Sequence, residues 1–85
     1  MTKEKQELPK WFNGEVYSEG GEVRNPHSGE SYELTAEELS MYDFIKGVEI
    51  YTSVIGMNEE HVEHMQKGLS WFRQTNPKAY MVLLD

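Results

Sequence analysis

Residues 34–39 read Leu-Thr-Ala-Glu-Glu-Leu, and this stretch divides the chain into two halves. Thr35 fits the N-cap position of a helix, and Glu38 follows three residues later, where its side chain can reach back to the Thr35 amide. Leu34 and Leu39 are spaced to pack against each other across that turn as a hydrophobic staple. The stretch therefore predicts that a helix begins here, after a polar first half that is rich in glycine.

This first helix is predicted over residues 35–55, with apolar residues on most of its circumference. Its main apolar stripe comprises Met41, Phe44, Val48, Tyr51 and Ile55, with Ile45 beside it. A second apolar set lies off that stripe and comprises Leu39, Tyr42, Ile50 and Val54. One neighbouring helix cannot cover both sides, so we expect this helix to contact more than one element. Gly47 lies in its middle, where a close approach by another backbone would explain a glycine.

The second half of the chain predicts an antiparallel helical hairpin. Gly56 is suited to end the first helix, and Asn58 to begin a second one over residues 59–74 after a very short loop. The residues expected to be buried between the two helices are Phe44, Val48, Leu69 and Phe72. Asn76, followed by proline, predicts a short final helix. A buried strand over residues 80–84 is the alternative.

The segment before the first helix predicts a small three-stranded antiparallel β-meander. Short alternating runs separated by turn signals at Gly20-Gly21 and at residues 25–29 cover residues 15–17, 22–24 and 31–34. The apolar residues expected to face the helices are Val16, Val23, Tyr32 and Leu34. We therefore predict one α+β domain over residues 11–85, preceded by a mobile charged arm over residues 1–10.

Length and composition limit what the chain can be. Eighty-five residues make one domain at most, and a core of this size is close to the limit of independent stability. The sequence has no cysteine, which excludes disulfides and thiolate metal sites. It also has neither a signal-peptide pattern nor an apolar run long enough to span a membrane, so we expect a cytoplasmic protein without membrane association.

Charge is distributed unevenly along the chain. The net charge is −7, and residues 11–66 alone carry twelve acidic and two basic side chains. Binding to a nucleic-acid backbone needs clustered lysine and arginine, so direct nucleic-acid binding is not expected. Such an acidic body suits contact with a basic protein surface, and it also keeps a small protein soluble.

Residues 25–45 read Asn-Pro-His-Ser-Gly-Glu-Ser-Tyr-Glu-Leu-Thr-Ala-Glu-Glu-Leu-Ser-Met-Tyr-Asp-Phe-Ile. Together with Asn-Pro-Lys-Ala-Tyr-Met at residues 76–81, this pattern resembles small uncharacterised proteins of marine phages. The resemblance implies a phage-like or marine microbial source and action in the cytoplasm of an infected host cell. It implies no catalytic residue, substrate or cofactor.

The candidate metal ligands are Glu60, His61 and His64, at the start of the second predicted helix. The two histidines are three residues apart and Glu60 lies one turn before His64, so all three side chains can lie on one side of the helix. A complete site would need ligands from other elements. The alternative is a solvated acidic helix start with two ordinary histidines.

The sequence shows no catalytic constellation. Ser28 and Ser31 have no nucleophile-elbow pattern around them, and the glycines follow no phosphate-binding pattern. We therefore expect a non-enzymatic acidic protein-interaction module without a cofactor, acting as a homodimer and, if phage-encoded, as a modulator of a host protein. The candidate contact residues are Leu39, Tyr42, Ile50 and Trp71. The alternatives are a metal-binding protein that uses His61 and His64, and an acidic mimic of nucleic acid.

Overall fold

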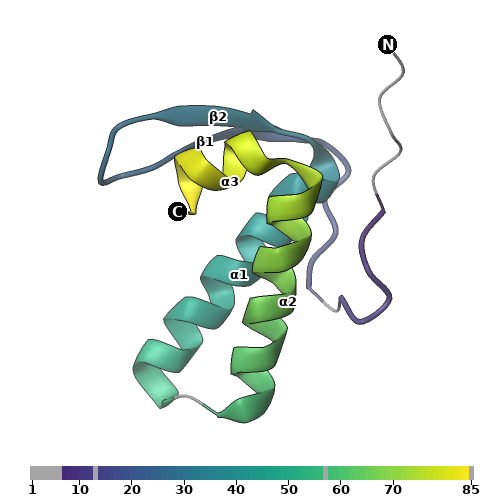
Figure 1. Cartoon of the computed structure of the whole chain (residues 1–85), viewed down its shortest axis with the longest axis vertical. Coiled ribbons are helices and arrows are strands. Elements are labelled where there is room, and N and C mark those ends of the chain that lie inside the picture. Colours follow the sequence, from purple (N-terminus) through teal and green to yellow (C-terminus); the bar gives the residue numbers. More distant parts are fainter. Residues whose placement is uncertain (1–6, 13, 57, 85) are drawn as a thin grey trace.

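The computed structural model describes residues 7–12, 14–56 and 58–84, and it has the predicted α+β class. Its elements are β1 (Gly21–Arg24), β2 (Ser31–Leu34), α1 (Ala36–Ile55), α2 (Glu59–Thr75) and α3 (Pro77–Leu83). Helices α1 and α2 form the predicted antiparallel hairpin, and the sheet and α3 lie at one end of it (Figure 1). We call this the covered end (residues 36–45 and 66–75), and the opposite end the open end (residues 46–56 and 58–65).

Each of the helices α1, α2 and α3 begins with a side-chain N-cap. The Thr35 hydroxyl accepts from the Glu38 amide at 3.2 Å, and Glu38 Oε1 accepts from the Thr35 amide at 3.0 Å, which confirms the predicted capping box. Asn58 Oδ1 caps α2, and Asn76 Oδ1 caps α3 by accepting from the Ala79 amide at 3.1 Å. The final segment is therefore a helix, as predicted, and the alternative of a strand there is wrong.

The two strands form an antiparallel hairpin in which Val23 lies opposite Tyr32. The Asn25 amide donates to the Glu30 carbonyl at 2.7 Å, and Gly29 closes the loop with a φ of 80°. This left-handed conformation favours glycine because a side chain would be strained there. The predicted turn at residues 25–29 is confirmed.

The predicted third strand at residues 15–17 is not confirmed, because the described residues form a sheet of two strands. The Tyr17 amide donates to Ser40 Oγ of α1 at 2.9 Å, so this segment runs along a helix instead of pairing with β1. Val16 is exposed, contrary to the expectation that it faces the helices. Gly20 lets the chain pass close to the end of β2, since a Cβ atom there would lie 1.9 Å from the Leu34 carbonyl oxygen.

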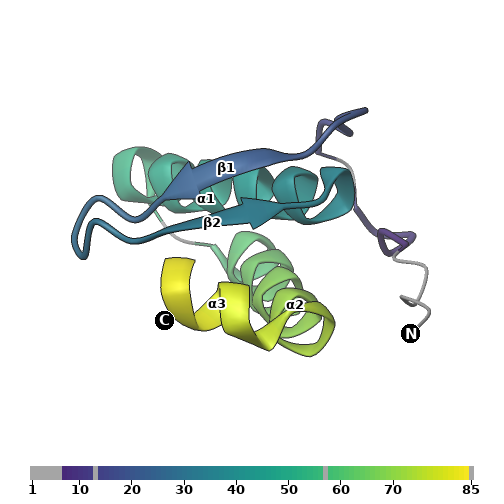
Figure 2. The same cartoon turned by 90° about the horizontal axis from the view of Figure 1, so that it is seen from above.

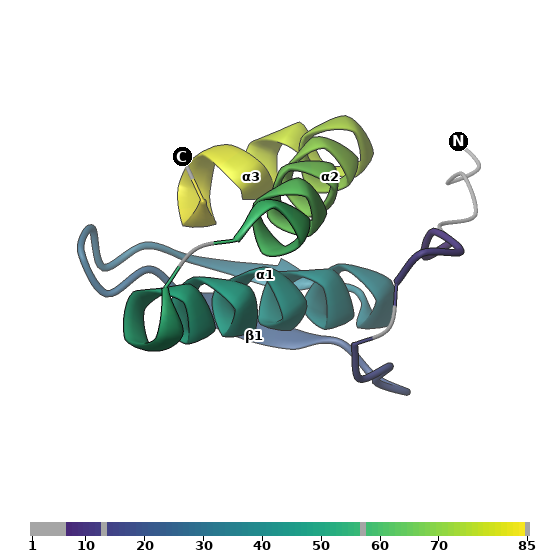
Figure 3. The same ribbon diagram turned by 90° about the horizontal axis from the view of Figure 1, so that it is seen from below.

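The buried apolar core lies at the covered end. It comprises Leu34, Met41, Ile45, Phe72, Ala79 and Leu83, which come from β2 and all three helices. Viewed along the hairpin from either end, the sheet lies beside α1 and α3 lies beside α2 (Figures 2 and 3). The two long helices approach closely at Gly68, where a Cβ atom would lie 3.1 Å from Ile45 Cγ1.

A buried carboxylate joins two helix starts at the covered end. Glu38 lies at the start of α1, and its Oε2 accepts from Asn76 Nδ2 at 3.0 Å. Asn76 ends α2 and caps α3, so these two side chains fix how the helices meet. Among the helices that the structure describes, none is both long and apolar enough to cross a membrane.

Candidate interaction site

The open end of α1 carries a concentration of exposed apolar side chains. The exposed fractions are 65% for Ile50, 48% for Tyr51, 74% for Val54 and 66% for Ile55. We call these four residues the open face. Tyr51 and Ile55 belong to the main apolar stripe, so this stripe is exposed at its end. The sheet and α3 do not extend to this end, so α2 alone accompanies α1 here.

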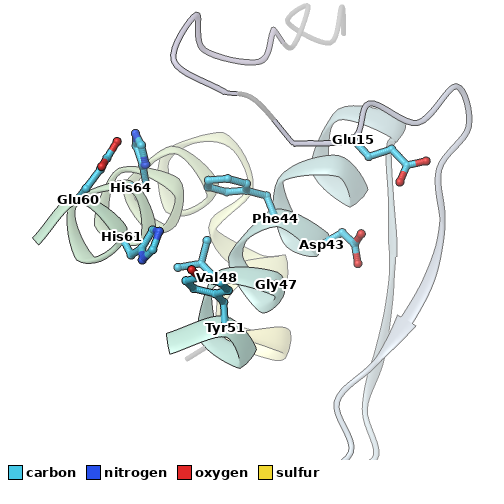
Figure 4. A pocket seen from close by; sticks show the side chains of 9 residues that line it. All are labelled: Glu15, Asp43, Phe44, Gly47, Val48, Tyr51, Glu60, His61 and His64. Atoms are coloured by element: carbon cyan, nitrogen blue, oxygen red, sulfur yellow. The ribbon is translucent and has the colours of Figure 1, made fainter. Parts of the chain in front are cut away.

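A groove of about 430 Å³ lies next to the open face, between α1 and α2 (Figure 4). Its apolar lining comes from Phe44, Val48 and Tyr51 of α1. Its charged lining comprises Glu15, Asp43 and Glu60, and Gly47, His61 and His64 complete it. Figure 4 shows Glu15 and Asp43 on one side of Phe44 and Glu60 on the other. Carboxylates therefore flank an aromatic and aliphatic floor.

Aromatic rings hold this floor in place. The Phe44 ring lies 5.8 Å from the Trp11 ring and 5.3 Å from the Phe12 ring, both in tilted geometry. The Trp11 ring also stacks on His64 at 5.7 Å. Gly14 allows this packing, since a Cβ atom there would lie 2.8 Å from the Phe12 ring. The segment before the sheet thus supports the groove from one side.

The two histidines of the predicted metal site have different ring partners. His61 packs edge-on against Tyr51 at 4.8 Å, whereas His64 stacks on Trp11. Within residues 7–12, 14–56 and 58–84, no three histidine or carboxylate side chains are placed to hold a metal ion. The His61 Nδ1 atom is buried and has no hydrogen-bond partner among these residues. Together with Glu60, both histidines line the groove.

Tyr17 connects the segment before β1 to the edge of the groove. Its hydroxyl donates to Asp43 Oδ2 at 2.7 Å. This hydrogen bond is the main cause that raises the pKa of Tyr17 above its ordinary value, with smaller contributions from desolvation and from the charges of Asp43 and Glu15. The Tyr17 phenol therefore lies beside Asp43, a carboxylate that lines the groove.

The four predicted contact residues lie in different environments. Leu39 and Trp71 pack against the core, and Trp71 Nε1 donates to the Glu7 carbonyl at 3.1 Å. Tyr42 is half-buried, with Lys46 Nζ 5.8 Å from its ring centre. Ile50 is largely exposed, so it is the member of the set that remains available for contact. Residues 1–6 of the predicted charged arm lie outside the described residues.

Sequence reasoning missed most of the groove. Glu15 and Asp43 were not singled out, and Phe44 and Val48 were assigned to the buried stripe. Val54 and Gly47 did carry a signal for the open end, because Val54 is an apolar residue outside the main stripe and Gly47 is a glycine in the middle of a helix. An exposed apolar residue and a glycine in the middle of a helix both indicate a surface on which another element can pack.

Comparisons with known proteins assign no relationship. No family model matches the chain, and no curated protein and no solved structure matches it significantly. The resemblance to marine phage proteins therefore stays a prediction. The function has to be argued from the open face and the groove.

Proposed function

We propose that this protein is a non-enzymatic protein-interaction module that associates with a second copy of itself through the open face of α1. The observation that carries the proposal is the exposure of Ile50, Tyr51, Val54 and Ile55 within six consecutive residues. Single exposed apolar residues are common on protein surfaces, but contiguous apolar patches are typical of interfaces.

The geometry of α1 suits a two-fold contact. Ile50 and Val54 are four residues apart and lie above one another on the helix, and Gly47 lies one turn before Ile50. A Cβ atom at Gly47 would meet nothing within 4 Å in the described chain, so a partner helix can come close to the backbone there. Closed two-fold dimers are the commonest way to bury one such patch against itself.

Sedimentation analysis of the full chain at micromolar concentration tests self-association. We expect about twice the chain mass of 9.9 kDa. Ile50→Glu should give the monomer mass, because a dimer would have to bury two carboxylates in an apolar contact.

Met81→Glu is the matched control, since Met81 of α3 is 66% exposed and Ile50 is 65% exposed. Circular dichroism should show that both variants keep their helices. A wild-type monomer, or equal dissociation by both substitutions, would contradict the proposed dimer surface.

A further inference from the structure

We propose that the groove between α1 and α2 binds an arginine or lysine side chain from a basic segment of a partner protein. This inference rests on the proposed role as an interaction module, but it does not depend on the dimer. The open face and the groove share Tyr51, whereas the charged groups belong to the groove alone.

The charges around the groove indicate that its occupant is positively charged. Glu15, Asp43 and Glu60 line the groove, and the described lining residues include no lysine or arginine. The basic residue of α1 is Lys46, and its Nζ lies 3.4 Å from Glu49 Oε1 in an ion pair. A cation that enters the groove would therefore meet carboxylates without competition from a resident cation.

The apolar floor indicates the shape of the occupant. Arginine and lysine have aliphatic stems that pack on apolar surface while their charged ends stay near water and carboxylates. Phe44 and Val48 offer such a surface, and the Phe44 and Tyr51 rings can also attract a cation placed over their faces. Neutral apolar side chains would fill the floor but offer no opposite charge to the three carboxylates, of which Asp43 already accepts a hydrogen bond from Tyr17.

The floor is also held in position before any partner arrives. Trp11 and Phe12 pack against Phe44 from one side, and His61 packs edge-on against Tyr51. Ordering costs on binding are smaller when the receiving side chains are already fixed. The groove therefore has both the chemistry and the rigidity to receive one long cationic side chain.

A peptide titration of the full chain, followed by amide chemical shifts, tests this proposal. The probe is a terminally blocked peptide with one arginine between alanines, and its counterpart carries citrulline, which has nearly the same shape without the charge. We expect the arginine peptide to shift the amides of Phe44, Gly47 and Tyr51, and increasing salt to weaken its binding. Equal shifts from the citrulline peptide would overturn the proposal of a cation site.

Two double substitutions separate local from general charge effects. Glu15→Gln with Glu60→Gln removes two groove carboxylates and should weaken arginine binding roughly fivefold, as expected for two partly exposed ion pairs. Glu19→Gln with Glu59→Gln is the control: Glu19 is an exposed loop residue like Glu15, and Glu59 shares the first turn of α2 with Glu60 but lines a separate depression. Equal weakening by both pairs would mean non-specific attraction and would also overturn the proposal.

The outcomes distinguish this inference from the proposed dimer. If the peptide does not bind while the chain sediments as a dimer that Ile50→Glu disrupts, the groove proposal fails and the dimer stands. If the wild-type chain is a monomer that binds the arginine peptide in the groove, the dimer fails and the cation site stands.

Discussion

The covered and open ends of the α1–α2 hairpin are built from the same two helices but differ in what packs against them. At the covered end, β2 and α3 complete a core around Met41 and Ile45. At the open end, Val54 and Ile55 of the same helix remain exposed. The difference teaches that apolar periodicity identifies the faces of a helix that can be buried, whereas the neighbouring elements decide which turns are buried.

This division also separates stability from contact. Most helical stability in proteins comes from packing against other elements, so the covered end is expected to hold the fold together. Regions with few buried apolar contacts open locally at lower free energy, and binding surfaces are often found there. The open face lies where such freedom is expected, whereas the groove beside it is held by the aromatic contacts of Phe44.

The largest expected effect contrasts two apolar truncations on the two ends. Phe72 is fully buried in the core, and Phe72→Ala should lower the free energy of unfolding by about 3–5 kcal/mol. Ile55 is exposed in the single chain, and Ile55→Ala should change the monomer's free energy of unfolding by less than about 0.5 kcal/mol, measured at concentrations too low for self-association. Urea denaturation followed by circular dichroism measures both.

If Phe72→Ala does not fold at all, Phe72→Leu provides a milder truncation whose cost can be measured against Ile55→Ala. Similar losses from the Phe72 and Ile55 substitutions would contradict the division into a covered and an open end. They would indicate that something in solution buries Ile55 as well.

Alanine substitutions of two mid-helix glycines, Gly47 and Gly68, should change the free energy of unfolding in opposite directions at the two ends. In the monomer, at concentrations too low for self-association, Gly47→Ala should raise the free energy of unfolding by about 1 kcal/mol, because alanine favours the helix and the new Cβ meets nothing within 4 Å. Gly68→Ala should lower it by about 1 kcal/mol, because its Cβ would be forced against Ile45 and the Met41 sulfur, at 3.1 and 3.2 Å. Thermal and urea unfolding of the two variants check these signs.

Stabilisation by both alanines would mean that the helices at the covered end separate easily. If the gain from Gly47→Ala is lost at concentrations where the chain associates, another backbone needs the space at that position, as in the proposed dimer contact. Comparing the concentration dependence of unfolding for Gly47→Ala and the wild type detects such a contact between two copies.

Features set by neighbours in the chain could be predicted from the sequence. The capping box at Thr35, the cap at Asn76 and the turn closed by Gly29 each depend on groups within about four residues. The helical hairpin followed because two amphipathic helices joined by a short loop must fold back on each other.

Features that depend on distant contacts could not be predicted. The run at residues 15–17 alternates like a strand, but Tyr17 makes its hydrogen bonds to Ser40 and Asp43, more than twenty positions away. Alternation alone carries no information about that partner. The predicted strand was therefore wrong, although the α+β class was right.

The candidate site shows the same limit. Ile50 was predicted as a contact residue because α1 has more apolar faces than one hairpin covers. Leu39 had the same signal on α1, and Trp71 was a candidate on α2, but both pack against the core, and Trp71 also donates a hydrogen bond to the Glu7 carbonyl. The groove was missed, since it brings together Glu15 and Glu60 from distant parts of the sequence.

The smallest expected effect concerns Tyr17, which ties the irregular segment to α1 near the boundary between the two ends. Because the Asp43 carboxylate accepts its hydrogen bond, the pKa of Tyr17 should lie above the ordinary 10.0 in the folded state. The folded chain then keeps this proton at pH values where the unfolded chain has lost it. The stabilisation is complete below pH 10 and declines as the pH rises through the folded pKa.

Tyrosinate absorbance during an alkaline titration, compared between the wild type and Tyr17→Phe, isolates this phenol from the other four tyrosines. Asp43→Asn should move its pKa back toward 10.0, because it removes the carboxylate that accepts the Tyr17 hydrogen bond, which is the main cause of the shift, together with the charge that opposes ionisation. Glu15→Gln should have a smaller effect, since Glu15 acts on Tyr17 through charge alone. If both substitutions left the Tyr17 pKa unchanged, the segment before β1 would not be held against α1 in solution, and the groove would lose the Glu15 side of its lining.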